Sequence, residues 1–312
     1  MPMSNYPGGF MEGISIRGLP IQVAHPGQVY FVNNSSVLAP SGIAGSNGNP
    51  GTYLKPFASI DYAVGRCSAS RGDIIMVMPG HVETVSAAAG LALDVAGVAV
   101  IGLGQGALRA KVNLTAAAAT VAISAASVSL YNMLFTGGID AIVSAIVVSA
   151  ADVSLVNCEL RDVTGQMELG ILTTAAADRL LVDGLVYNGA AAAGGVSAIA
   201  LVGGDHIKIR NFSIDGNFST SAIDIKTTAT TNLAIHDGYI WTKNAADLCI
   251  KDTVTASTGR IGPNLQLMLT DNAANVTEAV TGATFHMFDP VYVCNLVNEK
   301  AMLINWTAST DA

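Results

Sequence analysis

The sequence predicts an all-β fold in which short strands wind as the stacked coils of a parallel β-solenoid. The first observation is a repeat, in which five aligned octapeptides start 25, 26, 28 and 26 residues apart. They are VSLYNMLF (128–135), VSLVNCEL (153–160), RLLVDGLV (179–186), IKIRNFSI (207–214) and LAIHDGYI (233–240). The second observation is that the segments between them alternate like strands and show no helical period. A period of this length, built only from short strands, is typical of a solenoid coil.

Residues 1–50 are predicted to form an extended anchoring arm. The segment is rich in Gly, Pro, Asn and Ser and holds one strand candidate, VYFV (29–32), so alone it cannot bury a core. Residues 56–67 then have the character of a short helix. Pro56 suits a first helical turn, and apolar residues such as Ile60 and Val64 follow it.

The run VAVIGLGQGALRA (98–110) has glycines like those of a loop that holds a dinucleotide pyrophosphate. Such a loop needs G-x-G-x-x-G between a strand and an amphipathic helix. Here Gly102, Gly104 and Gly106 give G-x-G-x-G, and no helical period follows. Because VAVIGLGQ (98–105) also fits the octapeptide frame, we interpret the run as a bend in the first full coil and predict that it binds no cofactor.

A second alternating block precedes each copy of the octapeptide frame. The copies are LALDVAG (91–97), TVAISAAS (120–127), SAIVVSAAD (144–152), GILTTAAAD (170–178), SAIALVGGD (197–205) and SAIDIKTTATTN (221–232). Each block ends in a small or turn-forming residue. Every repeat unit therefore reads as strand, turn, strand, tight bend and strand.

The fifth position of the five octapeptides is always Asn or Asp. The residues are Asn132, Asn157, Asp183, Asn211 and Asp237. Stacked coils would place them about 4.8 Å apart at one bend, where an Asx side chain tolerates left-handed backbone and bonds neighbouring amides. We predict a structural ladder. The alternative is a row of metal ligands, but amides and lone carboxylates gather poorly around one ion.

The position after each octapeptide is predicted to face outward, because strand alternation sends the eighth residue inward. The residues at this position are Thr136, Arg161, Tyr187, Asp215 and Trp241. The last four combine aromatic faces with polar groups, which suits a glycan or a contact with another subunit. A plain solvated face is the third alternative.

Residues 273–312 are predicted to form a C-terminal capping or oligomerisation segment. From about Asp271 the chain leaves the period, and ATFHMFDPVYVCNLV (283–297) and AMLINWTAS (301–309) read as terminal strands. The parallel β-helix is therefore assigned to residues 51–272.

One further pattern begins at Pro56 and Phe57 and continues through the short helix. It ends with GDIIMVMPG (72–80) followed by His81. It resembles the start of right-handed parallel β-helices of the pectate-lyase-like family, and the resemblance covers roughly residues 51–272. It implies right-handed winding and a helix that plugs the open end, where strand edges would otherwise be exposed. The family includes polysaccharide lyases, hydrolases and bacteriophage virion proteins, so the resemblance predicts fold rather than activity.

The catalytic parts that the resemblance implies are not matched. Lyases of this family use acidic residues around calcium with a nearby Arg or Lys, and its hydrolases use paired aspartates, Gly-His-Gly and Arg-x-Lys. The sequence has no Asp-Asp pair and no Gly-His-Gly; GHVE (80–83) is half a match and IKIR (207–210) has the wrong order. His81 and Glu83 also mimic the His-x-Glu of zinc deaminases, without the Pro-Cys-x-x-Cys. We therefore predict no catalytic residue.

The composition of the chain argues against several classes of binding partner. Only 12% of the residues are charged, about half the usual roughly 25%, and the net charge of −8 argues against nucleic acid. The mean hydropathy of +0.47 is high, but no window of about 20 residues resembles a membrane span, and MPMSNYPGGF (1–10) does not resemble a signal peptide. The four cysteines form no C-x-x-C pair, so we predict neither metal nor cofactor.

These observations predict a non-enzymatic virion structural protein. We expect a homotrimeric capsid decoration, or cement, protein that binds the major capsid protein or another virion component through its arm, located on the virion and assembled in the host cytoplasm. The first coils would expose Ala, Ser, Thr and Val over more area than a monomer tolerates, and a cyclic trimer would cover it. The alternatives are a tail spike or fibre that binds host glycan through the outward column, and a polysaccharide lyase or hydrolase.

Overall fold

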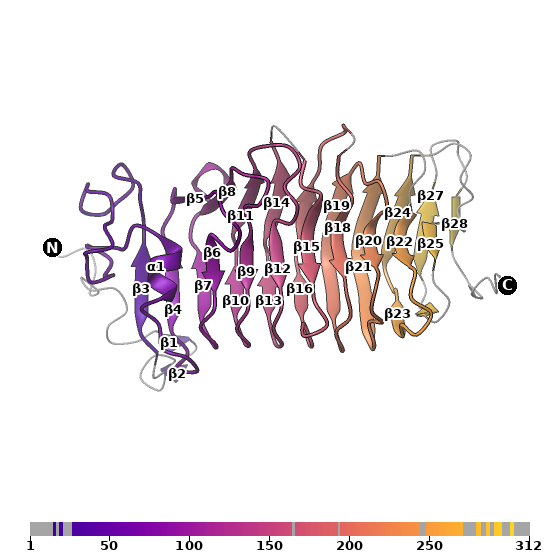
Figure 1. The fold of residues 1–312 in the computed structure, drawn as a ribbon, viewed down its shortest axis with the longest axis horizontal. Helices are drawn as coiled ribbons and strands as arrows, with labels where there is room; N and C mark the ends of the chain where they lie inside the picture. Colours follow the sequence, from indigo (N-terminus) through magenta and orange to yellow (C-terminus); the bar gives the residue numbers. More distant parts are fainter. Residues whose placement is uncertain are drawn as a thin grey trace.

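The chain folds as an all-β parallel solenoid of about eight coils, which confirms the fold class predicted from the repeat (Figure 1). The computed structural model describes residues 15–16, 19–20, 27–163, 166–192, 194–243, 248–270, 279–281, 285–287, 290–294 and 300–302. Each coil contributes strands to three faces that run along the solenoid axis. The parallel pairing is consistent with the right-handed sense that such crossovers take in nearly all proteins.

The three faces account for nearly all of the described strands. The first face contains β3 (Val29–Val32), β4 (Ile74–Val77), β7 (Ala99–Gly102), β10 (Ser129–Tyr131), β13 (Ser154–Val156), β16 (Leu181–Asp183), the first halves of β19 (Lys208–Gly216) and β21 (Leu233–Thr242), β23 (Gly259–Ile261) and β26 (Phe285–Met287). The second face contains β5 (Val82–Val85), β8 (Lys111–Leu114), β11 (Leu134–Gly137), β14 (Glu159–Asp162), β17 (Val186–Asn188), the second halves of β19 and β21, β24 (Leu265–Leu269) and β27 (Val291–Cys294), with β28 (Lys300–Met302) antiparallel to β27. The third face contains β6 (Leu91–Leu93), β9 (Val121–Ile123), β12 (Ile146–Val148), β15 (Leu169–Thr173), β18 (Ser197–Leu201), β20 (Ser221–Ile225), β22 (Leu248–Asp252) and β25 (Val280–Thr281).

Three short elements lie outside these faces. They are the antiparallel pair β1 (Ser15–Ile16) and β2 (Leu19–Pro20), the helix α1 (Ile60–Val64), and the 3₁₀ turn η1 (Gly106–Leu108). The described part of the chain therefore contains almost no helix.

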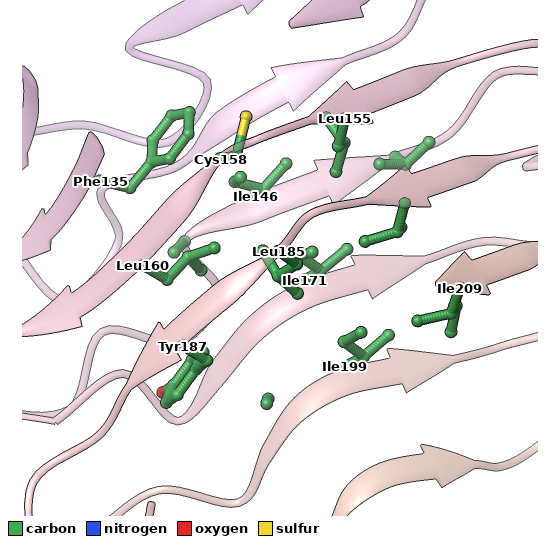
Figure 2. Close-up of a cluster of buried hydrophobic side chains, with 14 of the residues drawn as sticks. Phe135, Ile146, Leu155, Cys158, Leu160, Ile171, Leu185, Tyr187, Ile199 and Ile209 are labelled. Carbon is green, nitrogen blue, oxygen red and sulfur yellow. The ribbon is translucent and has the colours of Figure 1, made fainter. Parts of the chain in front are cut away.

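One core runs the length of the solenoid because the inward side chains of all three faces meet on the axis. Figure 2 shows Phe135, Leu160 and Tyr187 from the second face beside Ile146 and Ile171 from the third. All five are buried, and each apolar side chain stacks on the one in register with it in the next coil. Fully burying one such side chain contributes about 1.5–3 kcal/mol, so this column of apolar contacts is the main stabilising term.

The bend between the first and second faces is made by left-handed residues in successive coils. Those in the third to seventh coils are Asn132, Asn157, Gly184, Asn211 and Asp237, with φ between 52° and 71°. Asn132 ties its coil to the preceding one, because its Nδ2 donates to the carbonyls of Gly102 at 2.8 Å and Gly104 at 3.0 Å. This bend returns each coil to the same angular position.

Asp183 does not belong to this ladder, so its predicted place is wrong by one residue. In the strand register Leu155 pairs with Val182, not with Leu181, and Gly184 therefore takes the left-handed position. Asp183 lies one residue earlier, where its Oδ1 accepts a hydrogen bond of 2.7 Å from Asn211 Nδ2.

A second left-handed bend, between the third and first faces, was not predicted. Its members are Ser127, Asp152, Arg179, His206 and Asn232, with φ between 52° and 60°. Ser and Arg rarely adopt this backbone conformation, so residue type gives a weak signal there. Both bends recur once per coil, and together they fix the coil shape.

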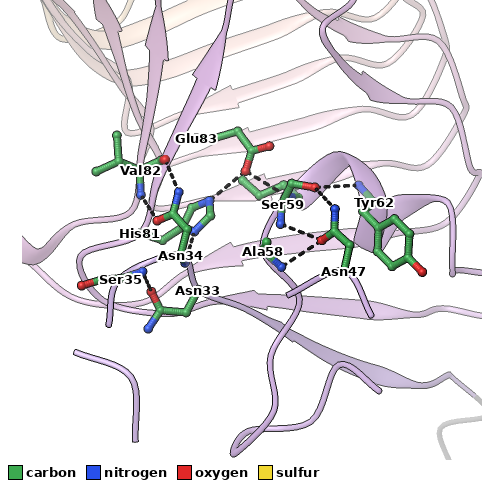
Figure 3. Close-up of polar contacts among 11 residues, drawn as sticks. Asn33, Asn34, Ser35, Asn47, Ala58, Ser59, Tyr62, His81, Val82 and Glu83 are labelled. Atoms are coloured by element: carbon green, nitrogen blue, oxygen red, sulfur yellow. Dashed lines mark hydrogen bonds and ion pairs between the residues drawn. The ribbon is translucent and has the colours of Figure 1, made fainter. Parts of the chain in front are cut away.

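The N-terminal end is closed by α1 and a buried polar network (Figure 3). Glu83 points inward beneath the helix and accepts from the Ile60 amide at 2.9 Å, with His81 Nε2 at 2.8 Å from the same oxygen. His81 Nδ1 accepts from the Asn34 amide, so Nε2 carries the proton and donates to Glu83. Thus GHVE (80–83) forms part of the cap.

The domain boundaries differ from the predicted ones at both ends. Residues 27–50 are not a free arm, because β3 pairs in parallel with β4. On the other side of β3, the Phe57 amide donates a hydrogen bond to the Phe31 carbonyl. At the far end the stacking continues past residue 272 into β26 and β27. Most of residues 1–26, and much of the predicted C-terminal segment, lie outside the described residues.

The left-handed bend can be tested at Asn132. An L-residue other than Asn, Asp or Gly loses about 1–2 kcal/mol in this conformation, so Asn132→Ala should lower the free energy of unfolding more than Asn132→Gly does. Urea denaturation measures both, with Ser129→Ala on the same coil as the control. Equal losses for the two variants would contradict the requirement for a left-handed residue.

Candidate functional site

Two columns of side chains form the outward surface of the second face, because every second residue of a strand points out. Column one is Val82, Lys111, Leu134, Glu159, Val186, Ser213, Tyr239, Gln266 and Tyr292. Column two is Thr84, Asn113, Thr136, Arg161, Asn188, Asp215, Trp241, Met268 and Cys294. The register therefore places side chains from different coils next to one another.

The prediction that Tyr187 faces outward is wrong. Tyr187 pairs with the inward Leu160, is 1% exposed, and packs on Phe218 with ring centroids 5.5 Å apart. Burial raises the pKa of its hydroxyl well above the ordinary value. Asn188 takes the predicted outward position, because the fifth coil is displaced by one residue from the octapeptide frame.

The distal part of column two is occupied by internal contacts. Trp241 Nε1 donates to Thr270 Oγ1 at 3.0 Å, and Lys243 Nζ lies 5.1 Å from the centre of the Trp241 ring. Lys243 also pairs with Asp215 at 2.5 Å. Arg161, Asp215 and Trp241 thus stay in the predicted column, but they do not form a continuous aromatic strip.

A hollow of about 580 Å³ lies at the N-terminal end of this surface. Its lining residues are Gly80, Val82, Gly106, Ala107, Arg109, Lys111, Leu134, Thr136, Glu159, Arg161 and Val163. The floor is the outward surface of β5, β8, β11 and β14. The insertion of residues 103–110, between β7 and β8, contributes Gly106, Ala107 and Arg109.

The glycine run thus builds one side of the hollow. Gly104 and Gly106 have φ of 90° and 56°, and a Cβ on Gly104 would lie 2.4 Å from the Leu108 carbonyl oxygen. The three-residue turn η1 follows and leads into β8. The amphipathic helix that a dinucleotide loop needs does not follow this run.

Arg109 fastens the insertion across three coils. Its Nη1 donates to Glu159 Oε2 at 2.9 Å and its Nε donates to the Asn132 carbonyl at 3.3 Å. Its Nη2 donates to the Asn157 carbonyl. One side chain therefore connects the insertion to the coils of β10 and β13, and it is held in a fixed position.

Glu159 is the buried acid of this group. Besides Arg109, it accepts from Arg161 Nε at 2.8 Å and from Asn188 Nδ2 at 2.8 Å, and it is 8% exposed. Charge-assisted bonds of this kind are the strong ones in proteins. The Lys111 ammonium group makes no hydrogen bond or ion pair with any residue that the structure describes, so three cations face one carboxylate in the hollow.

Sequence reasoning missed Glu159, Arg109 and Lys111 as a group. All three are among the only six charged residues of 86–160. This scarcity of charge was the one feature of the sequence that could have pointed to them. Their separations along the chain, up to 50 residues between Arg109 and Glu159, hide the cluster until the register is known.

A second group of charges lies at the bend that leads into the first face. Arg179 pairs with Asp152 at 2.6 Å, and Asp205 lies 2.6 Å from His206. Hydrogen bonds from Thr231 and from neighbouring groups hold the pKa of Asp205 well below its usual range. These acids are matched by internal partners, which suits stabilisation of the bend.

Two classes of site find no support in the part of the chain that the structure describes. No three His, Cys, Asp or Glu side chains gather there in a way that could hold a metal ion. No helix in this part is long and apolar enough to cross a membrane.

Comparison with known proteins gave one distant likeness. No protein-family model matches the sequence, and no curated protein matches it. A solved structure titled "Rhamnogalacturonan lyase" superposes with a TM-score of 0.43 and 13% sequence identity, covering 89% of this chain and 90% of that one.

The role of Arg109 can be tested by removing it. Arg109→Ala leaves Glu159 with fewer donors and two carbonyls without their partner, which should cost about 2 kcal/mol of unfolding free energy and speed hydrogen exchange in residues 103–110. Lys111→Ala in the same hollow is the matched control. Unchanged exchange in Arg109→Ala would show that the insertion is held by other contacts.

Proposed function

We propose that this chain is a non-enzymatic structural protein that assembles as a homotrimer and decorates a virus capsid. The observation that carries the proposal is the outward column of the third face. In successive coils it consists of Ala92, Ala122, Val147 and Leu172, and it ends at Ala200, which is already fully buried within the chain. None of these residues is charged, and the first four are half-buried in the single chain.

In the three coils that follow the first, the next outward residues are also small and uncharged. Ser124, Ser149 and Thr174 follow the strands of three neighbouring coils. The uncharged strip spans about 20 Å at about 4.8 Å per coil. An apolar sheet surface that can be approached closely favours association with a second copy, and a three-fold arrangement closes the assembly. Charge appears at both ends of this strip, at Asp94 after the first strand and at Asp224 and Lys251 farther along.

The chemistry of the hollow favours a non-enzymatic role. A general base needs a carboxylate that is free to accept a proton from substrate. Glu159 instead accepts from two arginines and from Asn188. We infer that this acid organises the surface and performs no proton transfer.

The capsid part of the proposal rests on the arm and on the resemblance to β-helix virion proteins. Residues 1–26 precede β3 and contain four Gly and four Pro, a composition that suits an extended segment laid on a partner. The partner would be the major capsid protein or another virion component.

The trimer is tested by placing a charge on the third face. The wild-type protein should sediment at three times the chain mass at micromolar concentration, and Val147→Glu should sediment as a monomer with an unchanged circular dichroism spectrum. Val37→Glu, at an 88% exposed valine far from this face, should remain trimeric. A monomeric wild-type protein would overturn the proposal.

The location is tested on purified particles. A decoration protein should be present in a copy number that matches the three-fold positions of the lattice, and deletion of residues 1–26 should release it while the trimer persists. The trimer persists because β3 and the cap remain in the shortened chain. A copy number that matches the tails would instead indicate a spike or fibre.

A further inference from the structure

We propose that the hollow on the second face receives an acidic, apolar peptide segment of a partner protein. The inference rests on the proposed function in one respect, namely that the occupant is a protein of the same assembly. It goes further by naming the surface that binds it and the chemistry that is recognised.

Unbalanced positive charge is the first argument. Arg109, Lys111 and Arg161 line the hollow with the single acid Glu159, which leaves a formal charge of about +2 in a protein whose net charge is −8. The only other charged residues between 84 and 158 are Asp94, Asp140 and Asp152, and none of them lines the hollow. Glu83 and Asp162 adjoin lining residues in sequence but do not line the hollow, because Glu83 accepts from Ile60 in the cap and Asp162 accepts from the Met167 and Ala190 amides. The lining itself therefore carries net positive charge.

Free donors are the second argument. Glu159 uses Nε and Nη2 of Arg161, and Nη1 of Arg161 donates to no group that the structure describes. The Arg161 side chain is 48% exposed. The Lys111 ammonium group likewise has no partner among the described residues. A carboxylate entering the hollow would meet a guanidinium edge and an ammonium group, the two donors that suit it best.

The aliphatic lining is the third argument, and it favours a peptide over a sugar acid. Val82, Leu134 and Val163 line the hollow, and no aromatic side chain does. Sugar rings are bound on aromatic faces, but the aromatic residues of these columns begin only at Tyr239 and Trp241, in the seventh coil. Aliphatic side chains beside a carboxylate match the side chains of a peptide.

Preorganisation is the fourth argument. Arg109 is held by three groups, and its side chain is 15% exposed. Glu159 holds Arg161 through a two-nitrogen contact. Because these side chains are already ordered, binding costs little further side-chain entropy.

The test uses a short fluorescein-labelled peptide of alternating leucine and glutamate. Its companions are the same peptide with glutamine for glutamate and a labelled oligogalacturonate of equal charge. Fluorescence anisotropy should show the acidic peptide binding about tenfold more tightly than the glutamine peptide and the sugar acid. Lys111→Gln should weaken the acidic peptide about fivefold, because it removes an unpaired cation.

Arg260→Gln is the matched control, since Arg260 is exposed on the first face of the eighth coil, away from the hollow. It should leave binding unchanged. Equal affinity for the acidic and glutamine peptides, tighter binding of the oligogalacturonate, or no saturable binding of the acidic peptide would each overturn the inference.

Sedimentation of the same samples separates this inference from the proposed function. Lys111→Gln should remain a trimer, because Lys111 lies on the second face. A monomeric wild type that binds the acidic peptide would overturn the trimer and keep the hollow. A trimer that binds none of the peptides would overturn the inference about the hollow and keep the trimer.

Discussion

The return of every coil to the same register is the constraint on which the rest of the structure depends. A coil cannot bury its inward side chains alone, so it is stable only when the next coil stacks on it in phase. Left-handed residues such as Asn132 and Arg179 set the two tight bends. Backbone hydrogen bonds and the columns around Phe135 and Leu160 then hold the phase. Because L-residues resist this backbone conformation, the bends are specific positions rather than loose connections.

The same constraint determines the surface. Once inward positions are fixed, strand alternation fixes the outward ones, and a side chain acquires neighbours from coils that lie a period away in sequence. Glu159 meets Asn188 for this reason, and Lys111 comes to lie beside Val82 and Leu134. A single residue of slip exchanges the two sides, which is how Tyr187 enters the core and leaves Asn188 outside.

The sequence was sufficient for the coil period and for four of the five predicted positions of the first bend, because period, alternation and Asn preference act locally. It failed at the fifth coil, where Leu181 and Val182 are adjacent, as are Val186 and Tyr187. Either of the two possible registers therefore places an apolar residue inward. Only the pairing of Val182 with Leu155 on the neighbouring strand decides between these registers. The hollow was not predictable for a different reason. Arg109 reaches acceptors two coils away, and no local pattern specifies such contacts.

The second face carries the insertion of residues 103–110, and its outward surface differs from that of the third face. On the third face the outward residues Ala122, Val147 and Leu172 are uncharged and half-buried, whereas Ala200 on β18 is fully buried. The bend between β7 and β8 carries an insertion instead, and Arg109 fixes it over the second face. A solenoid can accept such an insertion without losing register, because the strands before and after it still pair in phase. The insertion over the second face and the outward residues of the third face therefore belong to separate surfaces of one stack.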